Sequence, residues 1–218
     1  MKKLLGFIVL ITIVSSCNTK NSNKILPIYG NRQAISKTVN GQKITDTIYQ
    51  TIPAFKFVNQ YGDSISNKNV KGKIYVADFF FTSCPSICPI MQRNMITVYN
   101  EFIKTNDFKI LSFTIDPKYD SVAVLKKYAD KLDVKGNTWW FLQGKKDETY
   151  RLAETNFLVA VKKDSTVNGG YTHQGYFVLV DRQKRVRGAY DGTNKQQVAQ
   201  LIEDIKTLKN EPVNITVQ

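Results

Sequence analysis

The chain has 218 residues, of which 42% are hydrophobic and 22% are charged, and its formal net charge at pH 7 is +13. This length supports one good hydrophobic core, and three cysteines are too few for a fold held together by disulfides. The Lys and Arg residues are spread along the whole chain, which favours solubility or attraction to an acidic partner over a nucleic-acid-binding function.

The first 16 residues have the pattern of a bacterial signal peptide. Two lysines precede an apolar stretch from Leu4 to Val14, which is too short to span a bilayer comfortably. The stretch ends in Val14-Ser15-Ser16-Cys17, and small residues before a cysteine resemble the lipobox of bacterial lipoproteins. We therefore expect cleavage after residue 16 and lipidation of Cys17, rather than an ordinary secretory leader with an incidental cysteine.

A polar segment follows the leader. Residues 18–43 are rich in Asn, Lys, Ser and Thr and show little periodicity, so we expect a flexible tether over 17–45. One domain is predicted over 46–211, with a tail over 212–218. The domain begins with an alternating pattern over 53–66, interrupted by turn residues, which predicts a β-hairpin ahead of the core.

A near-continuous apolar run from Lys73 to Thr82 predicts a central strand that is buried on both faces. Helical and strand periodicities alternate after it. The remaining predicted elements are a helix over 89–104, a strand over 108–115, a helix from Asp120 or Ser121 to about 132, a strand over 139–142, a short helix over 147–156, strands over 175–180 and 186–190, and a helix over 194–208. A parallel β-α-β half joined to an antiparallel β-β-α end describes a thioredoxin-like α/β fold.

Two cysteines lie between the central strand and the first helix, in Cys84-Pro-Ser-Ile-Cys88-Pro. A residue before proline avoids the helical region and proline fits the first turn of a helix, so we expect Cys88 at or beside the helix N-cap. Because the helix N-terminus stabilises negative charge, both cysteines are predicted to be more acidic than free cysteine. Such thiolates suit copper ligation or disulfide exchange, and a buried structural disulfide is the plain alternative.

His173 is the only histidine and precedes the predicted strand over 175–180. In a thioredoxin-like sheet, the loop at this point faces the cysteine-bearing helix N-terminus. Thioredoxins have a cis-proline there, whereas this chain has no proline between Pro117 and Pro212. A lone histidine is more often a surface or hydrogen-bonded residue, but together with the cysteine loop it predicts a third metal ligand.

Three segments together resemble the Sco/SenC family: Lys73 to Pro89, Thr114 to Asp120, and the segment around His173. The resemblance covers about residues 50–208. It implies a thioredoxin-like, membrane-tethered copper protein that serves cytochrome c oxidase assembly, usually at the dinuclear copper centre of subunit II. The family's two motif cysteines match Cys84 and Cys88, and its ligand histidine matches His173. Many relatives use a transmembrane anchor, whereas lipid on Cys17 is expected here.

We therefore expect a metallochaperone that holds Cu(I) or Cu(II) through Cys84, Cys88 and His173 and delivers it to cytochrome c oxidase subunit II or a related copper protein. The alternative is a thiol–disulfide oxidoreductase that keeps a partner's copper-ligand cysteines reduced, with Cys84 and Cys88 as its catalytic redox pair. We also expect a monomer, anchored by lipid on the periplasmic side of a bacterial cell envelope, with no nucleic-acid partner.

Other polar and sulfur-containing residues have ordinary structural interpretations. The i, i+4 spacing of Met91 and Met95 predicts helix core rather than thioether ligands. Asp116 and Asp120 are interpreted as turn or cap residues, which leaves a role at the site rim open. The basic residues over 182–187 predict a solvated hairpin.

Overall fold

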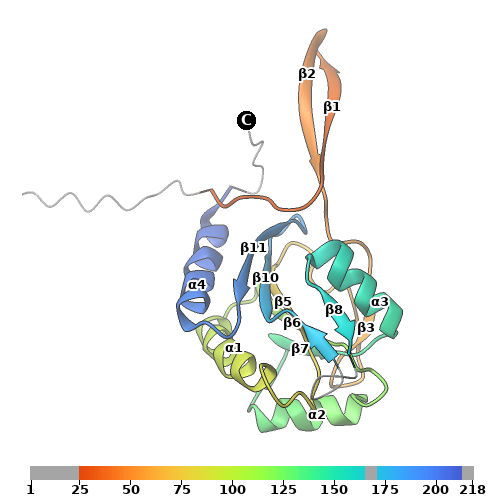
Figure 1. Ribbon diagram of the computed structural model, residues 1–218. Coiled ribbons are helices and arrows are strands. Elements are labelled where there is room, and N and C mark those ends of the chain that lie inside the picture. The colour runs from red at the N-terminus through yellow and green to blue at the C-terminus, as the bar shows by residue number, and fades with distance from the viewer. Residues whose placement is uncertain (1–24, 165–170, 213–218) are drawn as a thin grey trace, which may run out of the picture.

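The structure is a computed structural model that describes residues 25–164 and 171–212. Its centre is a five-stranded sheet with the strand order β11-β10-β5-β6-β7 (Figure 1). The strand bounds are β5 Ile74–Phe80, β6 Phe108–Thr114, β7 Trp139–Leu142, β10 Tyr176–Val180 and β11 Val186–Asp191. Strands β5, β6 and β7 run parallel, and β10 pairs antiparallel with both β5 and β11. This topology confirms the predicted thioredoxin-like α/β fold.

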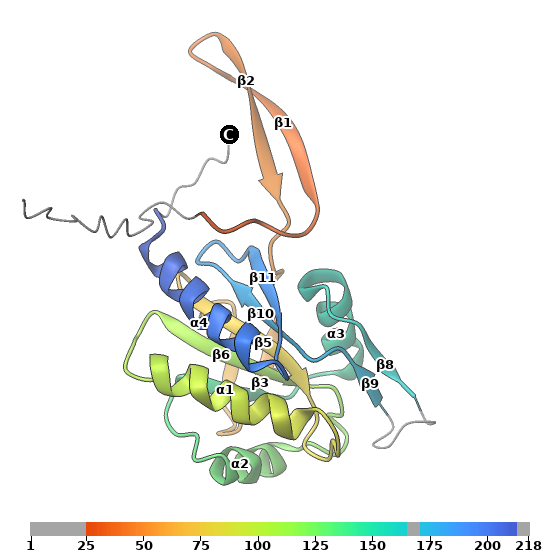
Figure 2. The same ribbon diagram turned by 60° about the vertical axis from the view of Figure 1, so that its left-hand side comes forward.

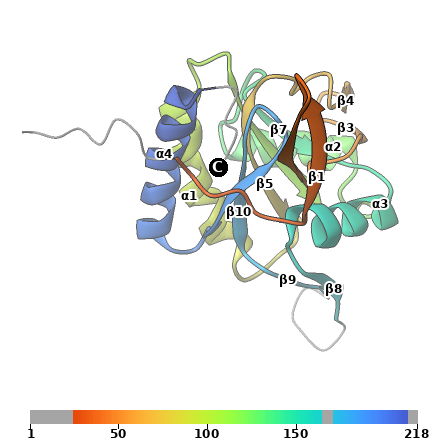
Figure 3. The same ribbon diagram turned by 90° about the horizontal axis from the view of Figure 1, so that it is seen from above.

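Three helices cover one face of this sheet. They are α1 (Cys88–Phe102), α2 (Val122–Lys131) and α4 (Lys195–Asn210). Tyr128 of α2 stacks on Phe80 of β5, and Tyr99 of α1 contacts Trp139 of β7. Both predicted core methionines of α1, Met91 and Met95, are fully buried. Seen from above, α1 and α4 lie together on one side of the sheet (Figure 3).

The opposite face is covered by a hairpin and a further helix. The hairpin pairs β3 (Lys56–Val58) with β4 (Ser64–Ser66), as the turn pattern predicted. The helix is α3 (Lys146–Arg151), which continues as the π-helical segment η1 (Leu152–Phe157). Phe57 of β3 and Phe157 of η1 both pack against Phe113 of β6, so an aromatic cluster joins these elements to the sheet.

The expected flexible tether over 17–45 is wrong for its second half. Strand β1 (Arg32–Val39) pairs antiparallel with β2 (Gln42–Tyr49), and the resulting hairpin projects from the body of the domain (Figures 1 and 2). Its turn is Asn40-Gly41, with φ of 51° and 79°. Two-residue hairpin turns need positive φ at both positions, which Asn-Gly adopts readily. The turn between β-branched runs is therefore a stronger signal than the polar composition. The leader and Cys17 lie outside the described residues.

The termini of the predicted helices agree closely with the structure. The Ser121 side chain caps α2 by accepting a hydrogen bond from the backbone N–H of Val124, and Asn194 caps α4 in the same way. One small sheet was not predicted. It pairs β8 (Val161–Lys163) with β9 (Tyr171–His173), so His173 lies on a strand rather than in the expected loop.

The turn between β10 and β11 is not the solvated basic hairpin that its composition predicted. Arg187 is buried and forms ion pairs with Asp181 at 3.0 Å and Glu211 at 2.8 Å. Its guanidinium also donates hydrogen bonds to the backbone carbonyls of Leu26 and Pro27. Arg187 therefore ties the end of α4 and the segment before β1 to the sheet. Within the described ranges, no helix is long and apolar enough to cross a membrane.

Candidate metal and redox site

The two cysteines lie where the fully buried strand β5 ends and the chain turns into α1. The backbone N–H of Cys84 donates a hydrogen bond to the carbonyl of Phe81 at 3.2 Å, which closes a tight turn. Cys88 is the first residue of α1, with Ile87 at the N-cap and Pro89 directly after it. The structure thus confirms that the helix starts beside Cys88, as the proline predicted.

Both cysteines are thiols outside any disulfide and both are buried, with Cys84 8% and Cys88 1% exposed. The two thiols share a hydrogen bond, so their sulfurs lie close enough to bind one small cation or to form a disulfide. The Cys84 sulfur also lies 3.7 Å from the Ser86 hydroxyl. Because Cys84 is the more exposed of the pair, an incoming metal donor or thiol meets it first.

The prediction that both cysteines are unusually acidic is wrong for Cys88. Its hydrogen bond with Cys84 and its burial raise its pKa above the ordinary value for a thiol, and the negative charge of Asp78 adds to this. A backbone hydrogen bond with Phe81 acts in the opposite direction but is outweighed. Cys88 therefore carries its proton at neutral pH, and a bound cation or an oxidation step must displace it.

A buried polar network lies beneath the cysteine pair. The fully buried carboxylate of Asp78 accepts hydrogen bonds from the Ser112 hydroxyl at 2.5 Å and from the Gln92 amide at 3.2 Å. The Ser112 oxygen in turn accepts a hydrogen bond from the Trp139 indole at 2.8 Å. This network links β5, α1, β6 and β7, so it holds the cysteine-bearing helix against the sheet. Asp78 was not among the predicted site residues, although an acidic residue inside an apolar strand indicates a special role.

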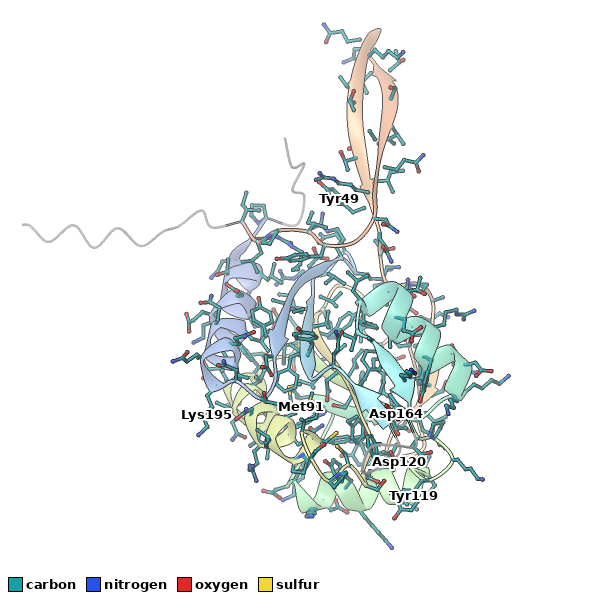
Figure 4. The ribbon with its side chains drawn as sticks, viewed as in Figure 1. Tyr49, Met91, Tyr119, Asp120, Asp164 and Lys195 are labelled. Carbon is teal, nitrogen blue, oxygen red and sulfur yellow. The ribbon has the colours of Figure 1, made fainter. Side chains whose placement is uncertain are left out.

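Asp120 forms hydrogen bonds to the segment just before Cys84. It is fully buried and accepts hydrogen bonds from the backbone N–H and hydroxyl of Thr82 and from the Thr114 hydroxyl. Burial raises the pKa of the Asp120 carboxyl, and these hydrogen bonds partly oppose the effect. Since Ser121 provides the helix cap, the role of Asp120, which is labelled in Figure 4, is to position the segment that leads to Cys84.

The chain beyond His173 packs against the cysteine segment. A side chain at Gly175 would lie 3.3 Å from the side-chain tip of Ile87 and 3.3 Å from the sulfur of Met91. Gly175 is also linked to α1 through Gly192, whose N–H donates to the Gly175 carbonyl at 2.7 Å and whose own carbonyl accepts from Asn94 at 2.8 Å. The fold therefore brings the chain just after the strand of His173 to the start of α1, although the position of the His173 imidazole is outside what the structure describes.

Among the side chains that the structure describes, no three His, Cys, Asp or Glu residues form a group that could hold a metal ion. The donors already in contact are the two thiols of Cys84 and Cys88. Soft sulfur donors of this kind suit Cu(I), and an imidazole would extend the set toward Cu(II). The two thiols thus fit copper chemistry, with a third ligand still to be supplied.

Comparisons with known proteins give one consistent result. Residues 43–210 match the SCO1/SenC family model. The chain is 33% identical over 169 residues to the SCO1 protein homolog of Bacillus subtilis, which covers 77% of this chain and 87% of that relative. The fold is similar to that of a SCO1/SenC family lipoprotein from Bacillus anthracis, with a TM-score of 0.66, 30% identity, and coverage of 73% of this chain and 95% of that one. It is also similar to yeast Sco1 with copper bound, with a TM-score of 0.56, 26% identity, and coverage of 72% and 89%. The chain therefore belongs to the SCO1/SenC family.

Proposed function

We propose that this protein is a copper metallochaperone that holds copper through Cys84, Cys88 and His173. It delivers this copper to a centre of cytochrome c oxidase, in subunit II or a related copper protein. The family is involved in copper delivery and oxidase assembly. The observation that carries the proposal is the contact between two buried thiols at the start of α1, beside the chain that follows His173.

Copper is the cargo of this site rather than a resident cofactor. The soft thiolates of Cys84 and Cys88 are sufficient ligands for Cu(I), and the imidazole of His173 completes the set that Cu(II) prefers. Binding must displace the thiol protons, including the proton that burial and the shared hydrogen bond retain on Cys88. Delivery then proceeds by ligand exchange, in which thiolates of the partner replace the two sulfurs stepwise, beginning at the more exposed Cys84.

A copper titration of the purified domain tests this proposal. The chain is expected to bind one Cu(I) tightly, and Cys84→Ser or Cys88→Ser is expected to abolish tight binding. Ser83→Ala is the matched control, because Ser83 is an exposed residue of the same loop. Tight binding that survives loss of either cysteine would contradict the proposed site. Transfer of the bound copper to an apo copper domain of subunit II tests delivery itself.

The same pair of thiols also favours a second function, reduction of a partner's disulfide. One thiol is partly accessible and the other is buried beneath it, which is the arrangement that an attacking and a resolving cysteine need. The Cys84 thiolate attacks the partner disulfide and forms a mixed disulfide, which releases one partner thiol. Cys88 then attacks the Cys84 sulfur, which releases the second partner thiol and leaves the Cys84–Cys88 disulfide.

Two variants separate the functions. Cys88→Ser is expected to trap the mixed disulfide of the reductase on Cys84, whereas the chaperone forms no such adduct. His173→Ala is expected to spare reductase activity while weakening Cu(II) binding. Copper-free protein with full reductase activity toward the oxidised partner would make reduction the main role.

We further propose that Cys17 carries lipid after removal of residues 1–16, and that this lipid holds a monomeric domain on the periplasmic side of a bacterial cell envelope. The lipobox-like sequence before Cys17 and the similarity to a Bacillus anthracis lipoprotein support this location. Mass spectrometry of the membrane-extracted protein is expected to find the lipid on the N-terminal peptide, and Cys17→Ser is expected to release the protein from the membrane. An unmodified Cys17 on an extracted, processed chain would refute the anchor.

A further inference from the structure

The hairpin β1–β2 has one face that carries all of its large aliphatic side chains, which we call its apolar face, and one hydroxyl-rich face. Side chains alternate across a strand, and the pairing of Lys37 with Ile44 and of Gln33 with Ile48 sets which residues share a face. This face carries Ile35, Val39, Ile44 and Ile48 in a diagonal row, beside Gln33, Lys37, Gln42 and Asp46. Three of these aliphatic residues are exposed in the structure, Val39 by 49%, Ile44 by 44% and Ile48 by 54%. Contiguous exposed aliphatic residues on a ribbon that projects from its domain indicate a contact surface.

The segment just before this hairpin is fixed to the domain. Leu26 is buried, its backbone N–H donates to the Glu211 carboxylate at 2.7 Å, and its carbonyl accepts from Arg187 at 2.6 Å. Cys17 precedes Leu26 closely enough that the intervening chain spans at most about 30 Å when fully extended. A lipid on Cys17 would therefore keep Leu26, and the base of the hairpin that follows it, near the membrane surface.

The charge of this region favours an anionic surface. The hairpin carries three basic residues, Arg32, Lys37 and Lys43, and one acidic residue, Asp46. Lys37 pairs with Asp46 at 2.5 Å on the same face as the aliphatic residues, so the net positive charge comes from Arg32 and Lys43 on the opposite face. Two further lysines lie between Cys17 and the described part of the chain. Basic residues on the polar face and aliphatic residues on the other face are typical of segments that lie at the interface of anionic membranes.

We infer that the apolar face of β1–β2 lies on an anionic lipid surface, as a second, non-covalent membrane contact beside the lipid on Cys17. Which membrane this is depends on the lipid anchor at Cys17 that is proposed above. The polar tip at Asn40-Gly41 and the unpaired edges of a two-stranded ribbon place it in the hydrated headgroup region and not in the hydrocarbon core.

This contact has a consequence for the copper site. Tyr49 at the base of the hairpin lies at one end of the domain, whereas Met91 and Asp120, which flank the cysteine segment, lie toward the other end (Figure 4). Two membrane contacts at the hairpin end restrict rotation of the domain about its tether. The cysteine pair then stays at the end remote from both contacts, where a partner's copper domain has access.

Vesicle binding by a chain that begins at Asn18 tests the inference, because this chain contains every described residue and lacks the lipid. The vesicles contain equal parts of phosphatidylglycerol and phosphatidylcholine. The paired variant Ile44→Asp with Ile48→Asp removes the apolar face. Thr45→Asp with Thr47→Asp is the matched control, since it adds the same charge on the opposite face of the same strand. The first pair is expected to lower binding about tenfold more than the second.

The aspartate pairs could lower binding by unfolding the hairpin, so a second experiment measures how deeply single hairpin residues enter the lipid layer. Ile44→Trp is expected to be quenched by brominated lipids, and Thr45→Trp is not, over the constant background of the buried Trp139 and Trp140. Equal losses for the two aspartate pairs, no vesicle binding by the parent chain, or quenching at both positions would overturn the inference. If the parent chain dimerises and the pair Ile44→Asp with Ile48→Asp abolishes the dimer, the apolar face would instead be the contact with a second copy of the chain. Failure of copper binding or of lipidation would not alter these readouts.

Discussion

The protonated state of Cys88 makes a specific prediction about the pH dependence of copper binding. The pKa of this thiol is raised by its hydrogen bond with Cys84 and by burial, so the proton is present throughout the neutral range. A thiol binds Cu(I) as thiolate, and each bound ion must therefore release the Cys88 proton. The sign follows directly, because a reaction that releases protons is favoured as the pH rises.

The magnitude follows from proton linkage. Displacement of the Cys88 proton alone raises the apparent association constant for Cu(I) about tenfold for each pH unit, which is about 1.4 kcal/mol, and a proton displaced from Cys84 adds to this slope. The tenfold slope is expected to persist above pH 8, where an ordinary free thiol begins to ionise and its contribution declines. Competition with a Cu(I) chelator of known protonation, repeated from about pH 6 to about pH 9, measures the slope.

The control for this measurement is Ser83→Ala, which is expected to show the same slope because both thiols remain in place. An association constant that does not change between pH 6 and pH 8 would refute the reasoning. That result would mean that both thiolates are already formed in the free protein. It would also support the prediction from sequence that the helix N-terminus makes both cysteines more acidic than free cysteine.

The remaining predictions concern the third ligand and the two buried clusters. His173→Ala is expected to keep Cu(I) binding and to lose most Cu(II) affinity, because the two sulfurs remain; a titration that shows equal loss for both oxidation states would contradict this. Arg187→Met is expected to destabilise the fold by about 3 kcal/mol and to lower Tm by roughly 10 °C, because it leaves the buried Glu211 carboxylate without its ion pair. Lys126→Met, which removes an exposed i, i+4 pair, is the control and is expected to cost about 0.5 kcal/mol or less in urea unfolding. Asp120→Ala is expected to cost about 2 kcal/mol in the same assay, because the N–H and hydroxyl of Thr82 lose their acceptor, and a neutral result would remove its assigned positioning role.

Most of the fold could be predicted from sequence because the signals were local. The apolar run of β5 has the length and composition of a doubly buried strand, and Ser121 and Asn194 mark helix starts that the structure shows. The N-terminal hairpin also has a local signal in its Asn40-Gly41 turn. The expected tether followed the polar composition of the segment instead, which is the weaker indicator.

The electrostatics of the site could not be predicted in this way. The helix N-terminus favours a low pKa for both thiols. The pKa of Cys88 is nevertheless raised, because its burial and its hydrogen bond with Cys84 have the larger effect. Similarly, Arg187 has the sequence context of an exposed turn, and only the fold brings Glu211 and Leu26 to it. These are long-range contacts, which neither spacing nor periodicity encodes.

Spectroscopy of the Cu(II)-loaded protein tests the central claim most directly, namely that His173 shares one copper ion with Cys84 and Cys88. Pulsed electron paramagnetic resonance is expected to show coupling to an imidazole nitrogen, together with an absorption band from sulfur-to-copper charge transfer. In His173→Ala, the imidazole coupling is expected to disappear. Wild-type protein that shows the sulfur band without any imidazole coupling would contradict the account.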